Sequence, residues 1–125
     1  MIKILPINSS EDLKKLYSDS NIELLSSSAA VVATDGDETI GYCLFYIDDK
    51  SMTVTALQPL SDLFLADGIL RSALHVGVER GVDKAFYSNS APIGVFEKLR
   101  FIKNDENNEL DINKLFSSCQ NCGNT

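Results

Sequence analysis

The chain has 125 residues, of which 44% are hydrophobic and 23% are charged, so it is long enough for one domain with a buried core. Its formal charge of −7 disfavours binding to nucleic acids and to anionic membrane surfaces, because both carry negative charge. No segment reaches the ~18 apolar residues of a membrane span, and residues 1–7 lack the apolar run of a signal peptide. We therefore expect a cytoplasmic globular protein.

The first half of the chain predicts a strand, a helix and three further strands. Residues 2–7 are mostly apolar and predict a strand, and Ser9 with the acidic residues after it predicts the start of a helix. The turn signal Asp35-Gly36-Asp37 lies between two β-rich runs and predicts a hairpin. The three predicted strands of this meander cover residues 29–34, 39–47 and 52–57.

The second half alternates between helix and strand. Apolar residues at helical spacing from Leu63 to Gly77 predict a long helix, which Gly81 should end. The elements expected after it are a strand over residues 84–88, a helix over 92–99, a strand from 101 and a short segment over 110–116.

The resulting order is β-α-β-β-β-α-β-α-β, which predicts an α/β fold with a mixed sheet, because helical crossovers favour parallel pairs and hairpins favour antiparallel ones. We expect residues 1–116 to form a single domain and residues 117–125 to be a flexible C-terminal tail.

The segment from Asn89 to Phe101 carries a recognisable pattern, with the block Phe96-Glu97-Lys98-Leu99 following a predicted strand. It resembles the GNAT acetyltransferase superfamily, whose members often have Asn, a few residues and then Tyr-Glu-Lys-Leu-Gly-Phe here. Leu57-Gln58-Pro59 is similar to the V-x-P that ends the family's fourth strand. The resemblance covers about residues 1–104 and implies a GNAT-like acyl-CoA N-acyltransferase fold.

The resemblance also implies a chemistry, which is direct transfer of an acetyl group from acetyl-CoA to an amine of a small molecule or peptide. In this family acetyl-CoA is the co-substrate and lies where the fourth and fifth strands splay apart. The pantetheine arm pairs with the fourth strand. The pyrophosphate accepts hydrogen bonds from free N–H groups at the start of the next helix. The residues that the resemblance assigns to acetyl-CoA are Ala56, Leu57, Gly68, Ile69, Asn89 and Phe96.

The family's phosphate motif, Q/R-x-x-G-x-G/A, is degenerate in this chain. Its best placement is residues 65–70, where only Gly68 matches and Asp67 adds a negative charge beside the expected phosphates. If the helix begins near Gly68, the N–H groups there are free to bind pyrophosphate. If it begins at Ser61, Gly68 lies inside the helix and its N–H is already bonded.

The proton-transfer groups of the family are also missing. Phe96 occupies the position of the tyrosine that protonates the CoA thiolate, and residues 51–57 hold no carboxylate that could act as a base. We assign no catalytic residue. Tyr42, Tyr46 and Asp48 are candidates for proton transfer, although a structural role is the stronger interpretation of each.

These departures keep a second function open, which is a catalytically inactive GNAT-fold binding or assembly module that has lost acetyl-CoA binding. Residues 8–28 have room for one helix, where family members usually have two. The acceptor site is therefore open, small, or completed by a second subunit in a homodimer.

The remaining constellations predict no metal site. His75 is interpreted as a surface histidine, and the carboxylates at residues 11–12 and 35–38 as helix-terminal charge and a turn. Cys119 and Cys122 have the spacing of half a zinc site, and a redox pair or two spare thiols in the tail are the alternatives. A thiol-dependent function of this tail is a third, weaker hypothesis.

Overall fold

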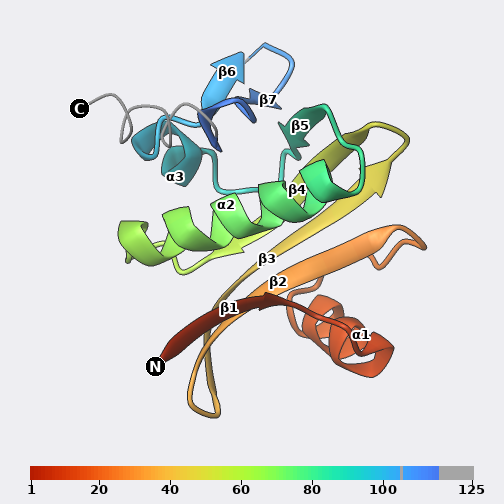
Figure 1. The fold of residues 1–125 in the computed structure, drawn as a ribbon, viewed down its shortest axis with the longest axis vertical. Coiled ribbons are helices and arrows are strands. Elements are labelled where there is room, and N and C mark those ends of the chain that lie inside the picture. Colours follow the sequence, from red (N-terminus) through yellow and green to blue (C-terminus); the bar gives the residue numbers. More distant parts are fainter. Residues whose placement is uncertain (105, 116–125) are drawn as a thin grey trace.

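The computed structural model describes residues 1–104 and 106–115, which form one sheet with three helices (Figure 1). The helices are α1 (Ser10–Asp19), α2 (Leu63–Glu79) and α3 (Ile93–Lys98). The strands are β1 (Ile2–Pro6), β2 (Ser28–Asp35), β3 (Glu38–Asp48), β4 (Ser51–Gln58), β5 (Lys84–Tyr87), β6 (Ile102–Asn104) and β7 (Glu109–Leu110). The strands lie in the order β1-β2-β3-β4-β5-β7-β6.

The sheet is mixed, as the sequence predicts. Strands β1 to β4 pair antiparallel with their chain neighbours, and β5 pairs parallel to β4 because α2 carries the chain back across the sheet. Strand β7 is antiparallel to both β5 and β6. The predicted α/β class and mixed sheet are therefore confirmed.

The N-terminal half follows the local signals in the sequence. Ser9 is the N-cap of α1, and its Oγ accepts a hydrogen bond of 3.3 Å from the backbone N–H of Asp12. Gly36 lies in the turn between β2 and β3 with φ of +65°, a conformation that glycine adopts without steric cost. The predicted hairpin is present here.

Of the two starts that the sequence allows for helix α2, at Ser61 or near Gly68, the structure has one close to the first. It begins at Leu63, and Asp62, not Ser61, is the N-cap, with its Oδ1 accepting from the N–H of Leu65 at 3.2 Å. Gly68 is consequently the sixth residue of the helix. At the other end, Gly81 has φ of +91° and follows the C-cap residue Arg80.

The C-terminal third has one more strand than the sequence predicts. A single strand was expected after α3, but β7 follows β6 and is inserted between β6 and β5. Its ladder to β5 has two pairs, Ala85 with Leu110 and Phe86 with Glu109. A strand of two residues is too short to show alternation, which is why the sequence indicates only a short segment here.

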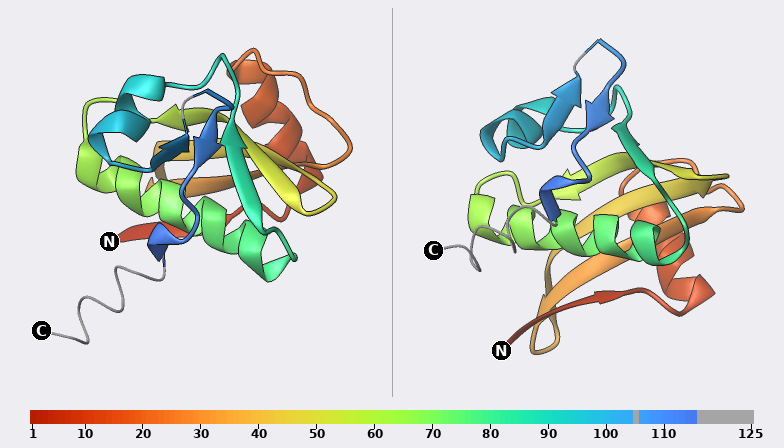
Figure 2. Two further views of the ribbon diagram at one scale, coloured as in Figure 1. Left: turned by 90° about the horizontal axis from the view of Figure 1, so that it is seen from above. Right: turned by 45° about the horizontal axis from the view of Figure 1, so that its top comes forward.

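Two apolar clusters fill the space on the two faces of the sheet. The larger one lies between the sheet, α2 and α3, and the smaller one centres on Tyr17 of α1 with Ala30 and Leu44. Figure 2 shows α1 and α2 on opposite sides of the sheet. As the segment length predicts, a single helix occupies residues 8–28. Among the residues that the structure describes, no helix is long and apolar enough to cross a membrane.

Candidate functional site

Strand β4 contains a bulge at Thr55. In the ladder with β3, Leu44 pairs with Ala56 and the next residue, Phe45, pairs with Val54, so Thr55 is the extra residue. The bulge changes the alternation of the strand, because the positions facing α2 are Met52, Val54 and then Leu57. An apolar residue three places after Val54 is the only sign of this bulge in the sequence.

The strands β4 and β5 separate just after this bulge. Their last ladder pair is Val54 with Tyr87, followed by a bond of 2.9 Å from the N–H of Ser88 to the carbonyl of Val54. The Oγ of Ser90 then donates to the carbonyl of Thr55 at 3.3 Å. Across the described residues, no ladder pair joins β5 to residues 56–58 of β4. This part of β4 therefore offers an unpaired backbone edge to a ligand.

Two buried hydroxyl groups donate to backbone carbonyls of β3 opposite the bulge. The hydroxyl of Thr55 donates to the carbonyl of Leu44 at 3.2 Å. The hydroxyl of Tyr17 shares its hydrogen between the carbonyl oxygens of Ala29 and Phe45, at 2.8 and 2.9 Å. Burial raises the pKa of Tyr17 above its ordinary value, so the phenol stays protonated as a donor. The sequence gives no signal for the role of either residue, because each role depends on strand register.

The predicted acetyl-CoA residues fall into two groups. Ala56 and Leu57 lie on the separated part of β4, half-buried and buried respectively. Asn89 is exposed in the loop after β5, where its Oδ1 accepts from Asn108 at 3.2 Å. Phe96 is fully buried in α3, and its ring centroid lies 5.3 Å from that of Tyr87 at the end of β5. These four residues come from segments that border the gap between β4 and β5.

The other two predicted residues, Gly68 and Ile69, lie in the interior of α2. Their N–H groups belong to the helix, so the free donors are those of the first turn, which begins at Leu63. The carboxylate of Asp62 already occupies this end of the helix. Gly68 has a packing reason as well, because a Cβ there would come within 3.3 Å of Ile4 Cδ1.

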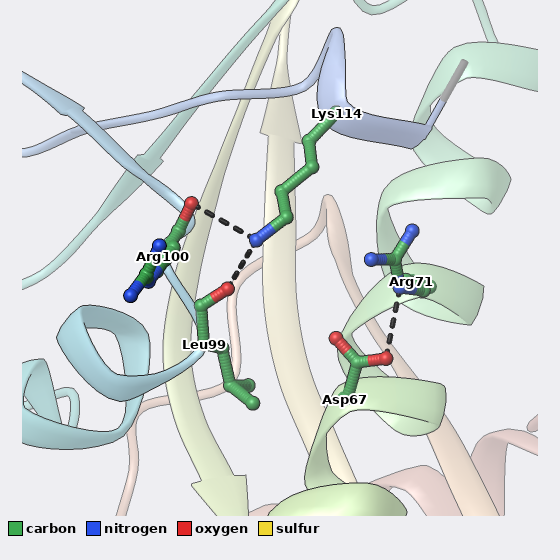
Figure 3. A network of polar contacts seen from close by, with 5 residues as sticks. All are labelled: Asp67, Arg71, Leu99, Arg100 and Lys114. Atoms are coloured by element: carbon green, nitrogen blue, oxygen red, sulfur yellow. Dashed lines mark hydrogen bonds and ion pairs between the residues drawn. The ribbon is translucent and has the colours of Figure 1, made fainter. Parts of the chain in front are cut away.

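Polar contacts lie between α2, the end of α3 and the segment after β7 (Figure 3). Arg71 Nε and Asp67 Oδ2 form an ion pair of 2.9 Å, so the arginine offsets the acidic residue in the degenerate motif. Lys114 Nζ donates to the carbonyls of Leu99 and Arg100 at the C-terminus of α3. Burial, followed by the positive charge of Arg71, lowers the pKa of Lys114. Lys114 thereby connects the segment after β7 to α3.

The side chains of Arg71 and Lys114 also lie over the buried ring of Phe101, at 5.1 and 4.7 Å from its centroid. The sequence gives no signal for this arrangement, because residues 71, 101 and 114 come from three separate segments.

The three candidates for proton transfer lie in different places. Tyr42 and Tyr46 are half-buried on the α1 face of β3, and the Tyr42 hydroxyl accepts from Ser20 Oγ at 3.3 Å. Asp48 pairs with Ser51 at the other end of the β3–β4 ladder from the gap. The structure therefore does not bring these three residues together.

The segments that follow β4 and β5 carry exposed apolar side chains. Leu60 and Leu63, in the turn before α2 and at its start, are 50% and 37% exposed, and Phe64 is 95% exposed. Ile93, at the start of α3, is 45% exposed. A Phe side chain this exposed is unusual and marks the surface as a candidate contact region.

Three of the surface hollows can be located by the residues that line them. One of about 620 Å³ is on the α1 face, one of about 450 Å³ lies between β1 and α2 and includes the exposed His75, and one of about 370 Å³ lies beside α3. The surface position predicted for His75 is confirmed. Within residues 1–104 and 106–115, no group of three His, Cys, Asp or Glu residues could hold a metal ion. Cys119 and Cys122 lie outside the described residues.

No family model matches the sequence, and no curated protein matches it. Solved structures do. A GNAT-family acetyltransferase from Streptococcus pneumoniae is 21% identical with a TM-score of 0.55, over 82% of this chain and 88% of that chain. The ribosomal-protein-S18-alanine N-acetyltransferase from Escherichia coli is 15% identical with a TM-score of 0.58, over 87% and 88%.

A third structure contains a ligand. It is PaiA N-acetyltransferase from Thermoplasma acidophilum in complex with coenzyme A, which is 13% identical with a TM-score of 0.50, over 83% of this chain and 78% of that chain. At such identities the similarity extends to the fold and not to the activity. With its mixed seven-stranded sheet and the separation of β4 from β5, this chain has the fold of the GNAT N-acetyltransferases.

Proposed function

We propose that this protein transfers an acetyl group from acetyl-CoA to an amine of a small molecule or peptide. The observation that carries the proposal is the unpaired edge of β4 beyond Val54, in a fold whose solved examples are N-acetyltransferases. An extended pantetheine arm can hydrogen-bond to such an edge as an added strand does.

In this proposal, Ala56 and Leu57 hold the pantetheine arm, and Asn89 and Phe96 border the thioester. The pyrophosphate lies near the start of α2, whereas Gly68 and Ile69 lie inside the helix and pack toward β1 and β3. The pyrophosphate fits the start of α2 less well than the pantetheine arm fits β4, because the carboxylate of Asp62 repels phosphate.

The reaction requires few protein groups. The amine nitrogen attacks the thioester carbonyl, an N–C bond forms as the C–S bond breaks, and the proton lost by the amine neutralises the CoA thiolate. Because Phe96 cannot donate that proton, catalysis would depend on binding and orientation of the two substrates. Phe96→Tyr would supply a phenol and should raise the turnover number by about 100-fold or more, whereas Phe86→Tyr, the control on β5, should not.

The exposed apolar residues Leu60, Leu63 and Phe64 favour a second candidate function, which is a non-catalytic binding or assembly module. Asp62 at the helix start favours it too, because the carboxylate takes the place of an anionic ligand. In this function these apolar side chains would contact another protein, and acetyl-CoA would not bind.

Calorimetry with acetyl-CoA, paired with a thermal shift, tests the two functions. Saturable binding, with a melting temperature that rises with ligand concentration, would support the transferase. A panel of amines would then identify the acceptor. The absence of heat and of a thermal shift at millimolar acetyl-CoA would refute the transferase and leave the binding module.

A further inference from the structure

The donor site of the proposed function has two ends of different character. One end is the backbone edge of β4 at residues 56–58, to which no described residue of β5 is paired. This edge suits the pantetheine arm of CoA, because the amide groups of the arm can hydrogen-bond to backbone N–H and carbonyl groups. The other end is the start of α2, where the ADP part of CoA would have to be held.

The segments that border the site contain no cation for a phosphate. Residues 51–70, which run from β4 into α2, include no lysine or arginine, and neither do residues 85–97, which run from β5 into α3. The same segments contain the carboxylates of Asp62, Asp67 and Glu97. Proteins bind phosphate groups through lysine, arginine and free helix N-termini, so the charge of these segments has the wrong sign.

The arginine that follows these residues on α2 is held by other groups. Arg71 Nε forms the 2.9 Å ion pair with Asp67 (Figure 3). Its guanidinium also lies 5.1 Å from the centroid of the buried Phe101 ring. The basic residue of α3 is Lys98, the last residue of that helix, at the end away from β5. The charge of Arg71 therefore balances Asp67 rather than a ligand.

The N-terminus of α2 is occupied by the protein itself. Asp62 Oδ1 accepts from the N–H of Leu65 at 3.2 Å, and the Asp62 carbonyl accepts from the N–H of Ala66 at 3.0 Å. Gly68 and Ile69 have their N–H groups inside the helix. A carboxylate at this end is stabilised by the helix dipole as an anionic ligand would be, and it repels such a ligand.

The surface beside this helix start is apolar. The exposed side chains of Leu60, Leu63 and Phe64 belong to the turn before α2 and to its first residues. The methyl groups of the pantetheine arm are compatible with such a surface, whereas a phosphate beside it loses hydration without gaining a hydrogen-bond donor.

We propose that the donor site recognises the pantetheine arm alone and gains nothing from the ADP part of CoA. Thioesters of pantetheine that lack the nucleotide are then donors as good as acetyl-CoA. This inference rests on the proposed function, which places the arm on β4, and it names the part of the donor that is recognised.

The experiment is a titration of the full chain with S-acetylpantetheine, acetyl-CoA and ADP, each alone and followed by amide NMR. S-acetylpantetheine has the same thioester arm without phosphates or adenosine, and its dissociation constant should lie within about threefold of that of acetyl-CoA. ADP at millimolar concentration should shift no amide saturably.

Two results would overturn the proposal. One is acetyl-CoA binding tighter than S-acetylpantetheine by about tenfold or more, which is a gain that a free helix N-terminus can give to an anion. The other is saturable binding of ADP alone at the start of α2.

Matched variants test the physical reason for this preference. Asp62→Asn keeps an N-cap side chain and removes the repulsion, so it should tighten acetyl-CoA binding by about two- to fivefold and leave S-acetylpantetheine binding unchanged. Asp83→Asn removes the same charge at an exposed position outside the bordering segments and should change neither affinity. An equal effect of Asp62→Asn on both donors would contradict the assignment.

The inference and the proposed function fail in different ways. If neither donor binds, the transferase is refuted and this inference with it. If acetyl-CoA binds and S-acetylpantetheine binds much more weakly, the transferase stands and the inference fails. If S-acetylpantetheine binds and acetyl-CoA does not, recognition of the arm stands and acetyl-CoA is not the donor.

Discussion

At the scale of single residues, Tyr17 has the greatest consequence for the sheet, because its hydroxyl is the donor for two backbone carbonyls of different strands. Tyr17→Phe removes both of these hydrogen bonds and should lower the free energy of unfolding by about 1–3 kcal/mol. Urea unfolding at neutral pH measures this. Tyr46→Phe is the control, since the structure gives that half-buried side chain no hydrogen bond within the described residues.

The same residue predicts a pH dependence. Burial raises the pKa of Tyr17 above its ordinary value of 10.0, so the folded protein holds this proton more tightly than the unfolded chain does. The free energy of unfolding should therefore fall as pH rises through 10. Buried Cys43, whose pKa is also raised, adds a loss that begins near its ordinary value of 9.0. Tyr17→Phe should show a shallower decline than the wild type, and equal slopes would contradict the assignment.

Gly41 provides a further test at this scale. A Cβ at this position would lie 2.7 Å from the carbonyl oxygen of Gln58 and 2.9 Å from Pro59 Cδ, at the end of β4. Gly41→Ala should cost about 1–3 kcal/mol, because backbone atoms would have to move. Gly94→Ala is the opposite case, since nothing lies within 4 Å of a Cβ there and alanine favours α3 by up to about 1 kcal/mol. Thermal unfolding of both variants would check the difference in sign.

At the scale of elements, the bulge in β4 depends on one hydroxyl. Thr55→Val keeps the shape of this buried side chain but removes the bond to Leu44. We expect a loss of about 1–2 kcal/mol in the free energy of unfolding and, if the proposed function holds, weaker acetyl-CoA binding. Thr53→Val, two residues earlier and half-buried on the same strand, should change neither quantity by more than about 0.5 kcal/mol.

A substitution at the start of α2 should strengthen acetyl-CoA binding, whereas Thr55→Val should weaken it. Asp62→Asn keeps an N-cap side chain, so stability should change by only a few tenths of a kcal/mol. It removes the negative charge from the helix end at which the pyrophosphate is proposed to lie. Calorimetry should then show tighter acetyl-CoA binding than in the wild type. A weaker or unchanged affinity would place the pyrophosphate elsewhere.

At the scale of the whole molecule, the segment after β6 completes both the sheet and the core. Leu110 and Ile112 are buried against the α2 side, and β7 is the only described neighbour of β6 in the sheet. A chain ending at residue 108 should lose about 3–6 kcal/mol of stability, from two buried aliphatic side chains. A chain ending at residue 116 is the control, and similar unfolding of the two would show that the segment contributes little.

The sequence predicts most of the elements, and the physical reason is local. Strand alternation, the Ser9 cap and the turn at Gly36 depend on residues a few positions apart, and each is present. The features that shape the candidate site depend instead on register between distant segments. The reach of Tyr17 to β3 and the position of Lys114 over Phe101 have no local signature, and the bulge at Thr55 is marked only by the spacing from Val54 to Leu57. The start of α2 is open in the sequence because both Ser61 and Gly68 are acceptable positions for it.

The two outer strands of the sheet have a further consequence, for the behaviour of the protein at high concentration. Strand β1 has exposed apolar residues, Ile2 and Leu5, and an unpaired outer edge, a combination that invites strands of other molecules to add on. It is short, carries Lys3 and ends on Pro6, which has no N–H to donate. Strand β6, at the other edge, has three residues, one of them Lys103. Both edges therefore carry features that oppose edge-to-edge aggregation.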